Sequence, residues 1–337
     1  MTLVDREQVE RLMVLAGALR SGLVDVLAAG PVTATAATVA LQANGRAVAV
    51  MLEALVSLGV AERDQPPPTS GAGSVADARE VAAPGPRYTL SALGRQRLVD
   101  PGPELERNWL LHQSNKVRSL YELPFIITHG RQRAALRAKK DQKACALTMG
   151  EGPSGPRDAV VDRILGYMSP SRPRNLLDVG GAVGHMSARF MARGIRPTLL
   201  DMPEVIELAR EKLGAVAAGM DFCACDFLRE LPAGPYDLVF LGNIFHIYGP
   251  ARNRDLLVRA GRVLAPGGVV AAVDFVWERS ARAALFAVNM LQATLEGGVW
   301  RERDYRAWFA EAGLEDVDIQ DLAHGSNQLL LARSPLG

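Results

Sequence analysis

A glycine-rich segment in the second half of the chain has the residue types of a ligand-binding turn. It reads NLLDVGGAVGHMSARF from residue 175 to residue 190, and its apolar start runs into Asp178. Gly180, Gly181 and Gly184 follow, and a helical sequence comes next. Because glycine has no Cβ, such a strand-to-helix turn lets the backbone approach a bound molecule closely. Turns of this kind bind several classes of nucleotide. The residues at the ends of the neighbouring strands must therefore indicate which class binds here.

The spacing of this turn departs from the dinucleotide fingerprint, G-x-G-x-x-G. Asp178, Gly180, Ala182 and Gly184 fall at every second position instead. An acid at the end of the strand would repel a pyrophosphate, but it suits a ligand with a cationic group near the loop. The turn therefore favours a nucleoside that carries a positive charge and no phosphate.

Two further strand ends carry residues that suit the rest of such a ligand. Asp201 ends the strand PTLLD, roughly 20 residues past the loop, where a carboxylate can accept both hydroxyls of a ribose. Asp226 and Phe227 follow the strand DFCAC, and a carboxylate beside a ring can recognise the edge and face of an adenine. Ligands of open parallel sheets bind at the carboxyl ends of the strands. A cationic group, a ribose and an adenine together predict S-adenosylmethionine as the cofactor.

The elements that must position these residues alternate between strands and helices from residue 175 onward. Short apolar segments such as DLVFL and VVAAVDF are separated by helical sequence, which predicts a doubly wound parallel sheet. The last two segments, EDVDIQDL and NQLLLAR, have no helix between them and predict an antiparallel hairpin. Residues 5–29 show helical periodicity with a break at Gly22, and a second helical pair covers roughly residues 33–59. The short strands VAER and RYTL then predict a two-stranded wing. Helices followed by such a wing form a winged helix.

Composition limits the classes of partner. The 337 residues carry a formal net charge of +1, which argues against a broad surface for nucleic acid. The longest apolar runs are far too short to span a bilayer, and three cysteines cannot make a disulfide framework. Cys223 and Cys225 form a C-x-C pair without a nearby cluster of ligands, which favours core packing over a metal site. We therefore expect a cytoplasmic protein that binds no metal, no nucleic acid and no membrane.

The chain resembles the class I S-adenosylmethionine-dependent methyltransferases, and specifically the winged-helix O-methyltransferase family of plant caffeate and bacterial polyketide enzymes. Three segments are similar to the N-terminal dimerisation domain of that family, namely SGLVDVLAAGPVTATAATVA, MLEALVSLGVAERD and RYTLSALGRQRLV. LLDVGGAVGH is similar to its cofactor loop, and APGGVVAAVDFV resembles the stretch that enters its fifth strand. The resemblance implies an all-α winged-helix dimerisation domain over residues 1–100 and a helical linker that contributes to the substrate pocket over 101–165. Residues 166–337 would form an α/β, Rossmann-like methyltransferase domain with a seven-stranded sheet.

The same resemblance implies the catalytic residues. His246, in the loop after the fourth strand, occupies the position of the family's base, which takes a proton from the acceptor hydroxyl. Histidine suits this task because its reference pKa of about 6.5 leaves it neutral at working pH. Asp274, which ends the fifth strand, fits the first of two acids that often flank the base. At the second place this chain has Val299 or Trp300, with Glu302 close in sequence.

The remaining expected site residues fall into two groups. The expected cofactor-binding residues are Asp178, Gly180, Gly181, Asp201, Met202, Asp226, Phe227, Gly242 and Asn243. The resemblance places Met149, Phe286, Asn289 and Met290 where the family builds its acceptor pocket. The expected protein is a homodimeric S-adenosylmethionine-dependent O-methyltransferase that acts on a small aromatic metabolite.

Two other functions remain as alternatives at this level. A winged helix also occurs in DNA-binding regulators, but the presumed recognition helix, RAVAVMLEALVSLG, carries only Arg46 and Glu53 as charged residues. Relatives of the family can also bind S-adenosylmethionine and methylate nitrogen or carbon, or catalyse hydroxylation or cyclisation. The missing second acid keeps this alternative open, whereas His246 favours O-methylation.

Overall fold

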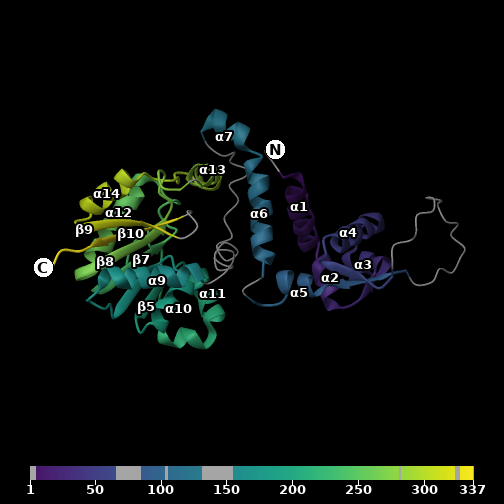
Figure 1. Ribbon diagram of the computed structural model, residues 1–337, viewed down its shortest axis with the longest axis horizontal. Helices are drawn as coiled ribbons and strands as arrows, with labels where there is room; N and C mark the ends of the chain where they lie inside the picture. The colour runs from purple at the N-terminus through teal and green to yellow at the C-terminus, as the bar shows by residue number, and fades with distance from the viewer. Residues whose placement is uncertain are drawn as a thin grey trace, which may run out of the picture. The chain divides into compact units, whose positions relative to one another are not determined.

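The computed structural model describes residues 5–65, 85–102, 105–130, 155–280, 282–322 and 327–336 (Figure 1). The chain divides into two compact units, residues 1–117 and residues 118–337. Within the described residues, we find no single helix that is both long and apolar enough to cross a membrane.

The N-terminal unit combines short helices with a small antiparallel sheet in the order β1-β3-β2. Four of its helices begin at a residue whose side chain accepts a backbone N–H of the first turn, namely Asp5, Thr33, Asn44 and Ser91. The elements are α1 (Arg6–Arg20), α2 (Leu23–Ala29), β1 (Val32–Thr33), α3 (Ala34–Leu41), α4 (Gly45–Ser57), β2 (Ala61–Arg63), β3 (Arg87–Leu90), α5 (Ala92–Leu98) and α6 (Arg107–Leu120). Gly22, with φ at +79°, separates α1 from α2 as the sequence predicts.

The N-terminal unit is not all-α as expected, because it contains this sheet, and the wing has one strand more than the sequence predicts. β2 and β3 are the expected strands, and β1 pairs with the other edge of β3, with Val32 opposite Tyr88. The expectation of two strands was wrong because β1 has only two residues and leads directly into α3, at its N-cap residue Thr33. A strand of that length has no alternation that a sequence pattern can reveal.

The C-terminal unit is built on a seven-stranded sheet in the order β6-β5-β4-β7-β8-β10-β9 (Figure 1). The strands from β6 to β8 in this order are parallel to their neighbours, and β10 is antiparallel to both β8 and β9. The elements are α7 (Leu123–His129), α9 (Gly155–Met168), β4 (Asn175–Val179), α10 (His185–Ala192), β5 (Arg196–Asp201), α11 (Pro203–Leu213), η2 (Gly214–Gly219), β6 (Asp221–Ala224), β7 (Tyr236–Gly242), α12 (Pro250–Arg262), β8 (Leu264–Asp274), α13 (Ala283–Ala293), α14 (Glu302–Glu311), β9 (Glu315–Asp321) and β10 (Gln328–Arg333). The predicted parallel sheet with an antiparallel C-terminal hairpin is confirmed.

Helices cover both faces of this sheet. On β4, Leu177 and Val179 face a core that α12 and α14 complete, whereas Leu176 faces a second core built with α9 and α10. This alternation arises because successive side chains of a strand point to opposite faces. The chain runs from β4 outward to β6 and then returns to β7 on the other side of β4. The carboxyl ends of β4 and β7 therefore flank the topological switch point, where ligands of such sheets bind.

Candidate active site

The glycine-rich turn between β4 and α10 lies at this switch point. Gly180 has φ at +67° and Gly184 has φ at +80°, a region that side chains other than glycine rarely adopt. A Cβ on Gly180 would lie 2.6 Å from Cδ1 of Ile244, and a Cβ on Gly184 would lie 2.8 and 2.9 Å from two leucine side chains. The N–H of Gly180 donates to the carbonyl of Leu200 at 2.8 Å, which holds the turn against β5. Both the backbone conformation and the space at the turn require glycine.

Asp178 lies beneath this turn and supports it. Its side chain is buried, and its Oδ2 accepts a hydrogen bond of 2.6 Å from the hydroxyl of Ser187 on α10. A Cβ on Gly181 would lie 2.9 Å from Cγ of the same carboxyl group. Burial raises the pKa of Asp178 to about 6; the Asp201 carboxylate adds to the shift, and the Ser187 hydroxyl opposes it. The structure thus brings Asp178 to the predicted turn, on the side of the sheet that packs on α10.

Asp201 joins the end of β5 to the same turn. Its Oδ2 accepts the N–H of Ala182 at 2.9 Å, and its Oδ1 accepts the N–H of Met202 at 2.8 Å. Burial raises the pKa of Asp201, while these two backbone donors oppose the increase. A carboxylate oxygen has two lone pairs, so each oxygen can still accept one hydroxyl donor. This partly exposed carboxylate is well suited to a vicinal diol.

An aromatic pair borders the other side of the turn. Phe227, which follows β6, lies with its ring in edge contact with the ring of Tyr248, at 5.9 Å between centroids. Its Cε1 is 3.4 Å from the position that a Cβ on Gly180 would take. The preceding Asp226 accepts the N–H of Leu228 at 2.9 Å, which shapes the loop after β6. Sequence reasoning did not include Tyr248 in the site, although its place two residues after His246 was a usable signal.

His246 and Asp274 form the central polar contact of the site. The ring Nδ1 of His246 lies 2.9 Å from Oδ1 of Asp274, and the backbone N–H of His246 donates to Oδ2 at 3.2 Å. Asp274 is fully buried, and its Oδ1 also accepts the N–H of Phe275 at 2.8 Å. A carboxylate is an acceptor only, so neutral His246 carries its proton on Nδ1 and leaves the Nε2 lone pair available. That arrangement suits a general base.

Aromatic side chains surround the imidazole on one side. The ring of Phe286, on α13, is perpendicular to that of His246 at 4.9 Å and stacks on Phe275 at 4.0 Å. Asn289 and Met290 lie on the same helix, where Met290 is buried and Asn289 accepts the amide N–H of Gln292 at 2.8 Å. Of the predicted acceptor-pocket residues, Phe286 contacts His246, and Met149 lies outside the described residues.

The end of β7 carries the last two residues predicted to bind the cofactor. Asn243 has φ at +61°, donates its N–H to the carbonyl of Val273 at 2.8 Å, and accepts the side-chain amide of Asn327 at 3.1 Å. A Cβ on Gly242 would lie 2.8 Å from the ring of Phe240. These contacts hold the loop that leads to His246 against the ends of β8 and β10.

Residues 108–315 match the family model of the O-methyltransferase domain. The chain belongs to this family. The assignment confirms the predicted enzyme class, an S-adenosylmethionine-dependent O-methyltransferase.

Individual relatives agree with this assignment. Acetylserotonin O-methyltransferase of Mus musculus molossinus is 28% identical over 321 residues, which cover 88% of this chain and 78% of that protein. In fold, the methyltransferase is similar to human N-acetylserotonin methyltransferase in complex with SAM, with a TM-score of 0.72 at 19% identity and 99% of both chains covered. It is also similar to PigF with SAH, with a TM-score of 0.73 at 21% identity, covering 98% of this chain and all of the other.

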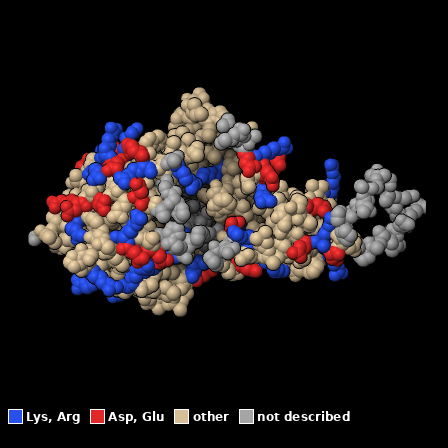
Figure 2. All heavy atoms as spheres, in the orientation of Figure 1, with Lys and Arg blue, Asp and Glu red and all other residues tan. Residues whose placement is uncertain are grey.

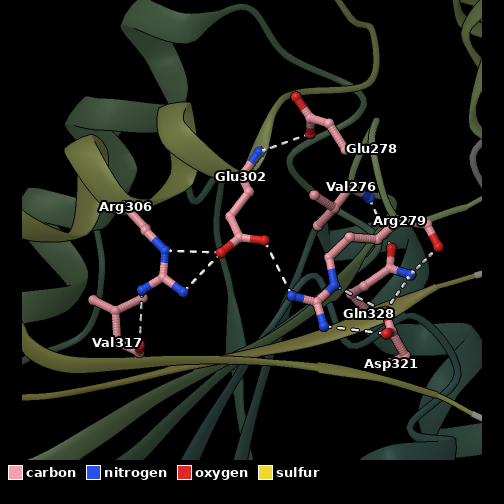
Figure 3. Close-up of polar contacts among 8 residues, drawn as sticks. All are labelled: Val276, Glu278, Arg279, Glu302, Arg306, Val317, Asp321 and Gln328. Carbon is pink, nitrogen blue, oxygen red and sulfur yellow. Dashed lines mark hydrogen bonds and ion pairs between the residues drawn. The ribbon is translucent and has the colours of Figure 1, made fainter.

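The carboxylate of Glu302 lies at the start of α14, between two arginines (Figure 3). Its Oε1 accepts from Arg306 at 2.9 Å, and its Oε2 accepts from Nη1 of Arg279 at 3.0 Å. Hydrogen bonds from Arg306 and then Arg279 lower the pKa of Glu302 against the opposing effect of burial. Both carboxylate oxygens of Glu302 thus accept hydrogen bonds from the two arginines.

The two neutral positions aligned with the second acid lie near His246. Val299 packs in a small core with Phe275 and Phe286, and the indole N–H of Trp300 donates to the carbonyl of Phe245 at 2.8 Å. These two side chains bring no ionisable group to the methyltransferase site. Asp274 is therefore the acid that the structure places on His246.

A buried glutamine holds the chain where it leaves Asp274 (Figure 3). Gln328 lies directly opposite Asp274 in the pairing of β10 with β8, and it is fully buried. Its Oε1 accepts the N–H of Val276 at 2.8 Å, and its Nε2 donates to Oδ1 of Asp321 at 3.2 Å and to the carbonyl of Arg279 at 3.4 Å. Sequence reasoning missed this residue because a lone glutamine in an apolar strand has no motif around it.

In the part of the chain that the structure describes, no three His, Cys, Asp or Glu side chains gather closely enough to hold a metal ion. The donors that do gather at the strand ends are carboxylates, backbone amides and rings. At Gly180 the side chains of Ile244 and Phe227 lie 2.6 and 3.4 Å from the position of a Cβ, so any larger residue would displace the groups that line the turn. This donor set fits an adenosine linked to a cationic amino acid chain.

Proposed function

We propose that this methyltransferase methylates a hydroxyl of a small aromatic metabolite, with His246 as the general base. The observation that carries the proposal is the 2.9 Å contact between Nδ1 of His246 and Oδ1 of Asp274, at the carboxyl end of the sheet. When bound, S-adenosylmethionine supplies an electrophilic methyl group on a sulfonium centre.

The residues that would hold the cofactor come from four strand ends. Asp201 would accept the ribose hydroxyls, because each of its oxygens keeps a free lone pair beyond its backbone donor. Asp226 and Phe227 would contact the adenine, and Gly180 would allow the methionine end to approach the backbone. The full proposed set is Asp178, Gly180, Gly181, Asp201, Met202, Asp226, Phe227, Gly242 and Asn243, in which Asp178 acts by supporting the turn.

His246 would accept the proton of the acceptor hydroxyl at Nε2. A phenol has a pKa of about 10 and is mostly protonated near neutral pH, so a positioned base accelerates its reaction typically about 10²–10⁴-fold. The imidazolium that forms would be stabilised by Asp274, whose carboxylate is buried and already bonded to Nδ1. Further acceleration comes from holding the hydroxyl oxygen in line with the methyl group.

An aromatic acceptor is supported by the side chains around the base. The ring of Phe286 is perpendicular to that of His246, and its stacking on Phe275 makes an apolar wall beside the imidazole. Aromatic pairs prefer such stacked or perpendicular contacts, and a planar acceptor can use either. The similarity to acetylserotonin O-methyltransferase supports the same class of acceptor. Asn289, Met290 and Met149 complete the proposed pocket.

We also propose that the protein forms a homodimer through its N-terminal domain. Val39 on α3 and Val50 on α4 expose 73% and 62% of their surface, and burial of these apolar side chains would contribute to such an interface. Glu53, the acid of the presumed recognition helix, is engaged by Arg63 and Tyr88 at 2.7 and 2.6 Å. On the face shown in Figure 2, basic and acidic side chains are interspersed, and a purely basic stripe of the kind that binds nucleic acid is not seen on this face.

The test of the enzymatic proposal is methyl transfer from labelled S-adenosylmethionine to a matched acceptor set. A phenol, its amine analogue and its deoxy analogue would be compared, with products identified by mass spectrometry. Labelling of the phenol alone is the expected result. Labelling of the amine alone, or binding of S-adenosylmethionine without transfer to any hydroxyl, would contradict the proposal.

A further inference from the structure

Two thiols lie side by side near the end of β6, just before Asp226. Cys223 is in β6 and Cys225 follows two residues later, and their Sγ atoms are 3.3 Å apart. Residues two apart on a strand project to the same face, and both side chains pack with Phe227 against the larger core of the sheet. Both are partly exposed, so a small reagent can reach them.

A backbone hydrogen bond and a peptide bond connect Cys225 to the residues proposed to bind adenosine. The backbone N–H of Cys225 donates to the carbonyl of Asp201 at 3.1 Å, and Asp226 is the next residue. β6 lies at the edge of the sheet, so this part of the chain can shift without breaking a second ladder. A movement of Cys225 therefore changes the position of Asp226 relative to Asp201.

We propose that Cys223 and Cys225 form a dithiol modification site, which a small-molecule disulfide oxidises to an intramolecular disulfide, and that this closure weakens cofactor binding. The second half of the inference rests on the proposed roles of Asp201 and Asp226. In the reaction, one protein thiolate attacks a sulfur of the small disulfide and releases one thiol. The second protein thiol then displaces the other half. The two cysteines lose two protons and two electrons, and the small disulfide becomes two thiols.

The nucleophile in this reaction is the thiolate. Burial raises the pKa of Cys225 to about 12, and the adjacent Cys223 adds to the shift. Once one of the two sulfurs has formed the mixed disulfide, the other sulfur, 3.3 Å away, closes the ring. Bond formation brings the sulfurs from 3.3 Å to about 2.05 Å, so the chain around Cys225, whose N–H donates to the carbonyl of Asp201, has to adjust.

The experiment uses the full-length Cys145→Ser variant, in which Cys223 and Cys225 are the only cysteines. After treatment with oxidised glutathione, the intact mass is expected to fall by two hydrogen atoms, and peptide mapping should place the disulfide between the two residues. Calorimetry with S-adenosylhomocysteine should then give a dissociation constant raised by about tenfold, restored by dithiothreitol. Cys145→Ser with Cys225→Ser is the matched control, because it can form only a mixed disulfide.

Three results would overturn the inference. A stable glutathione adduct on Cys223, or no change in mass, would show that the pair does not close. A closed disulfide with an unchanged dissociation constant would remove the link to the cofactor. If the reduced protein fails to bind S-adenosylhomocysteine, the proposed function fails instead, because the mass measurement judges the disulfide independently.

Discussion

The imidazole Nδ1 of His246 lies 2.9 Å from Oδ1 of Asp274, although 28 residues separate them in the sequence. The contact exists because β7 and β8 are adjacent and parallel, so that the loop after β7 meets the last residue of β8. Asp274 accepts both the ring and the backbone N–H of His246, and it thereby sets the orientation of the ring and of the loop.

Replacing His246 by glutamine should lower the methyl-transfer rate by at least about a hundredfold, because the proposed base is lost. The dissociation constant for S-adenosylhomocysteine, measured by calorimetry, should stay the same. His129→Gln is the matched control, since it removes an exposed histidine whose ring contacts the carbonyl of Phe125 in α7. Unchanged turnover in His246→Gln would remove the assignment of the base.

Asp274→Asn keeps the size of the side chain but changes what it can accept. Asp274 receives three N–H groups, two from His246 and one from Phe275, and an asparagine presents a donor to at least one of them. We expect kcat to fall by about a hundredfold or more and the free energy of unfolding to fall by about 1–3 kcal/mol. Steady-state kinetics and urea titration measure the two effects. A variant with wild-type kcat would show that Asp274 does not orient His246 for catalysis.

Asp201→Ala should weaken binding of S-adenosylhomocysteine by at least about tenfold, because it removes the two acceptors proposed for the ribose hydroxyls. Thermal unfolding of the same sample separates this effect from loss of the turn, since Ala182 and Met202 donate to the carboxylate. Asp221→Ala is a matched control, because this exposed acid pairs with Arg196 at the start of β6. An equal loss of affinity in both variants would count against the ribose assignment.

Gln328→Leu should reduce both stability and turnover. The leucine leaves the buried N–H of Val276 without its acceptor, which costs about 1–3 kcal/mol of the free energy of unfolding. We expect kcat to fall while the affinity for S-adenosylhomocysteine is retained, because Gln328 lies opposite Asp274 and not beside the glycine turn. Gln320→Leu, on β9, is the control, since its amide contacts only the nearby Asp318 among the contacts described. Loss of affinity in step with kcat would indicate a general collapse of the site.

The raised pKa of Asp178 predicts that the free energy of unfolding depends on pH. Its pKa rises from 3.8 to about 6 on folding, chiefly because of burial, so the native state binds more protons between these values than the unfolded state. The free energy of unfolding should therefore fall as the pH rises through this window, by up to about 3 kcal/mol from this group. Asp178→Asn lacks this contribution, so its stability relative to wild type should rise from pH 4 to pH 6. Urea titrations at four pH values test this, and parallel profiles for the two proteins would refute it.

Local features of this chain were readable from its sequence. The glycine turn, the order of strands and helices after residue 175 and the C-terminal hairpin follow from periodicity and turn residues, which act over a few positions. The family resemblance placed His246 and Asp274 as partners, and the structure brings them into contact. The two-residue strand β1 escaped prediction because local periodicity needs more residues than it has.

Tertiary structure decided which groups the side chains meet. The position of Asp178 beneath the turn, against Ser187, could not be read from spacing, because the partner comes from the helix that packs on β4. Glu302 is near the second acid position in sequence, yet Arg279 and Arg306 take both its oxygens. Gln328 reaches the end of β8 only because β10 inserts between β8 and β9. The sequence by itself determined the elements and the chemistry available at their ends; the pairing of those groups required the packed sheet, since hydrogen-bond partners distant in sequence are chosen by strand order and burial.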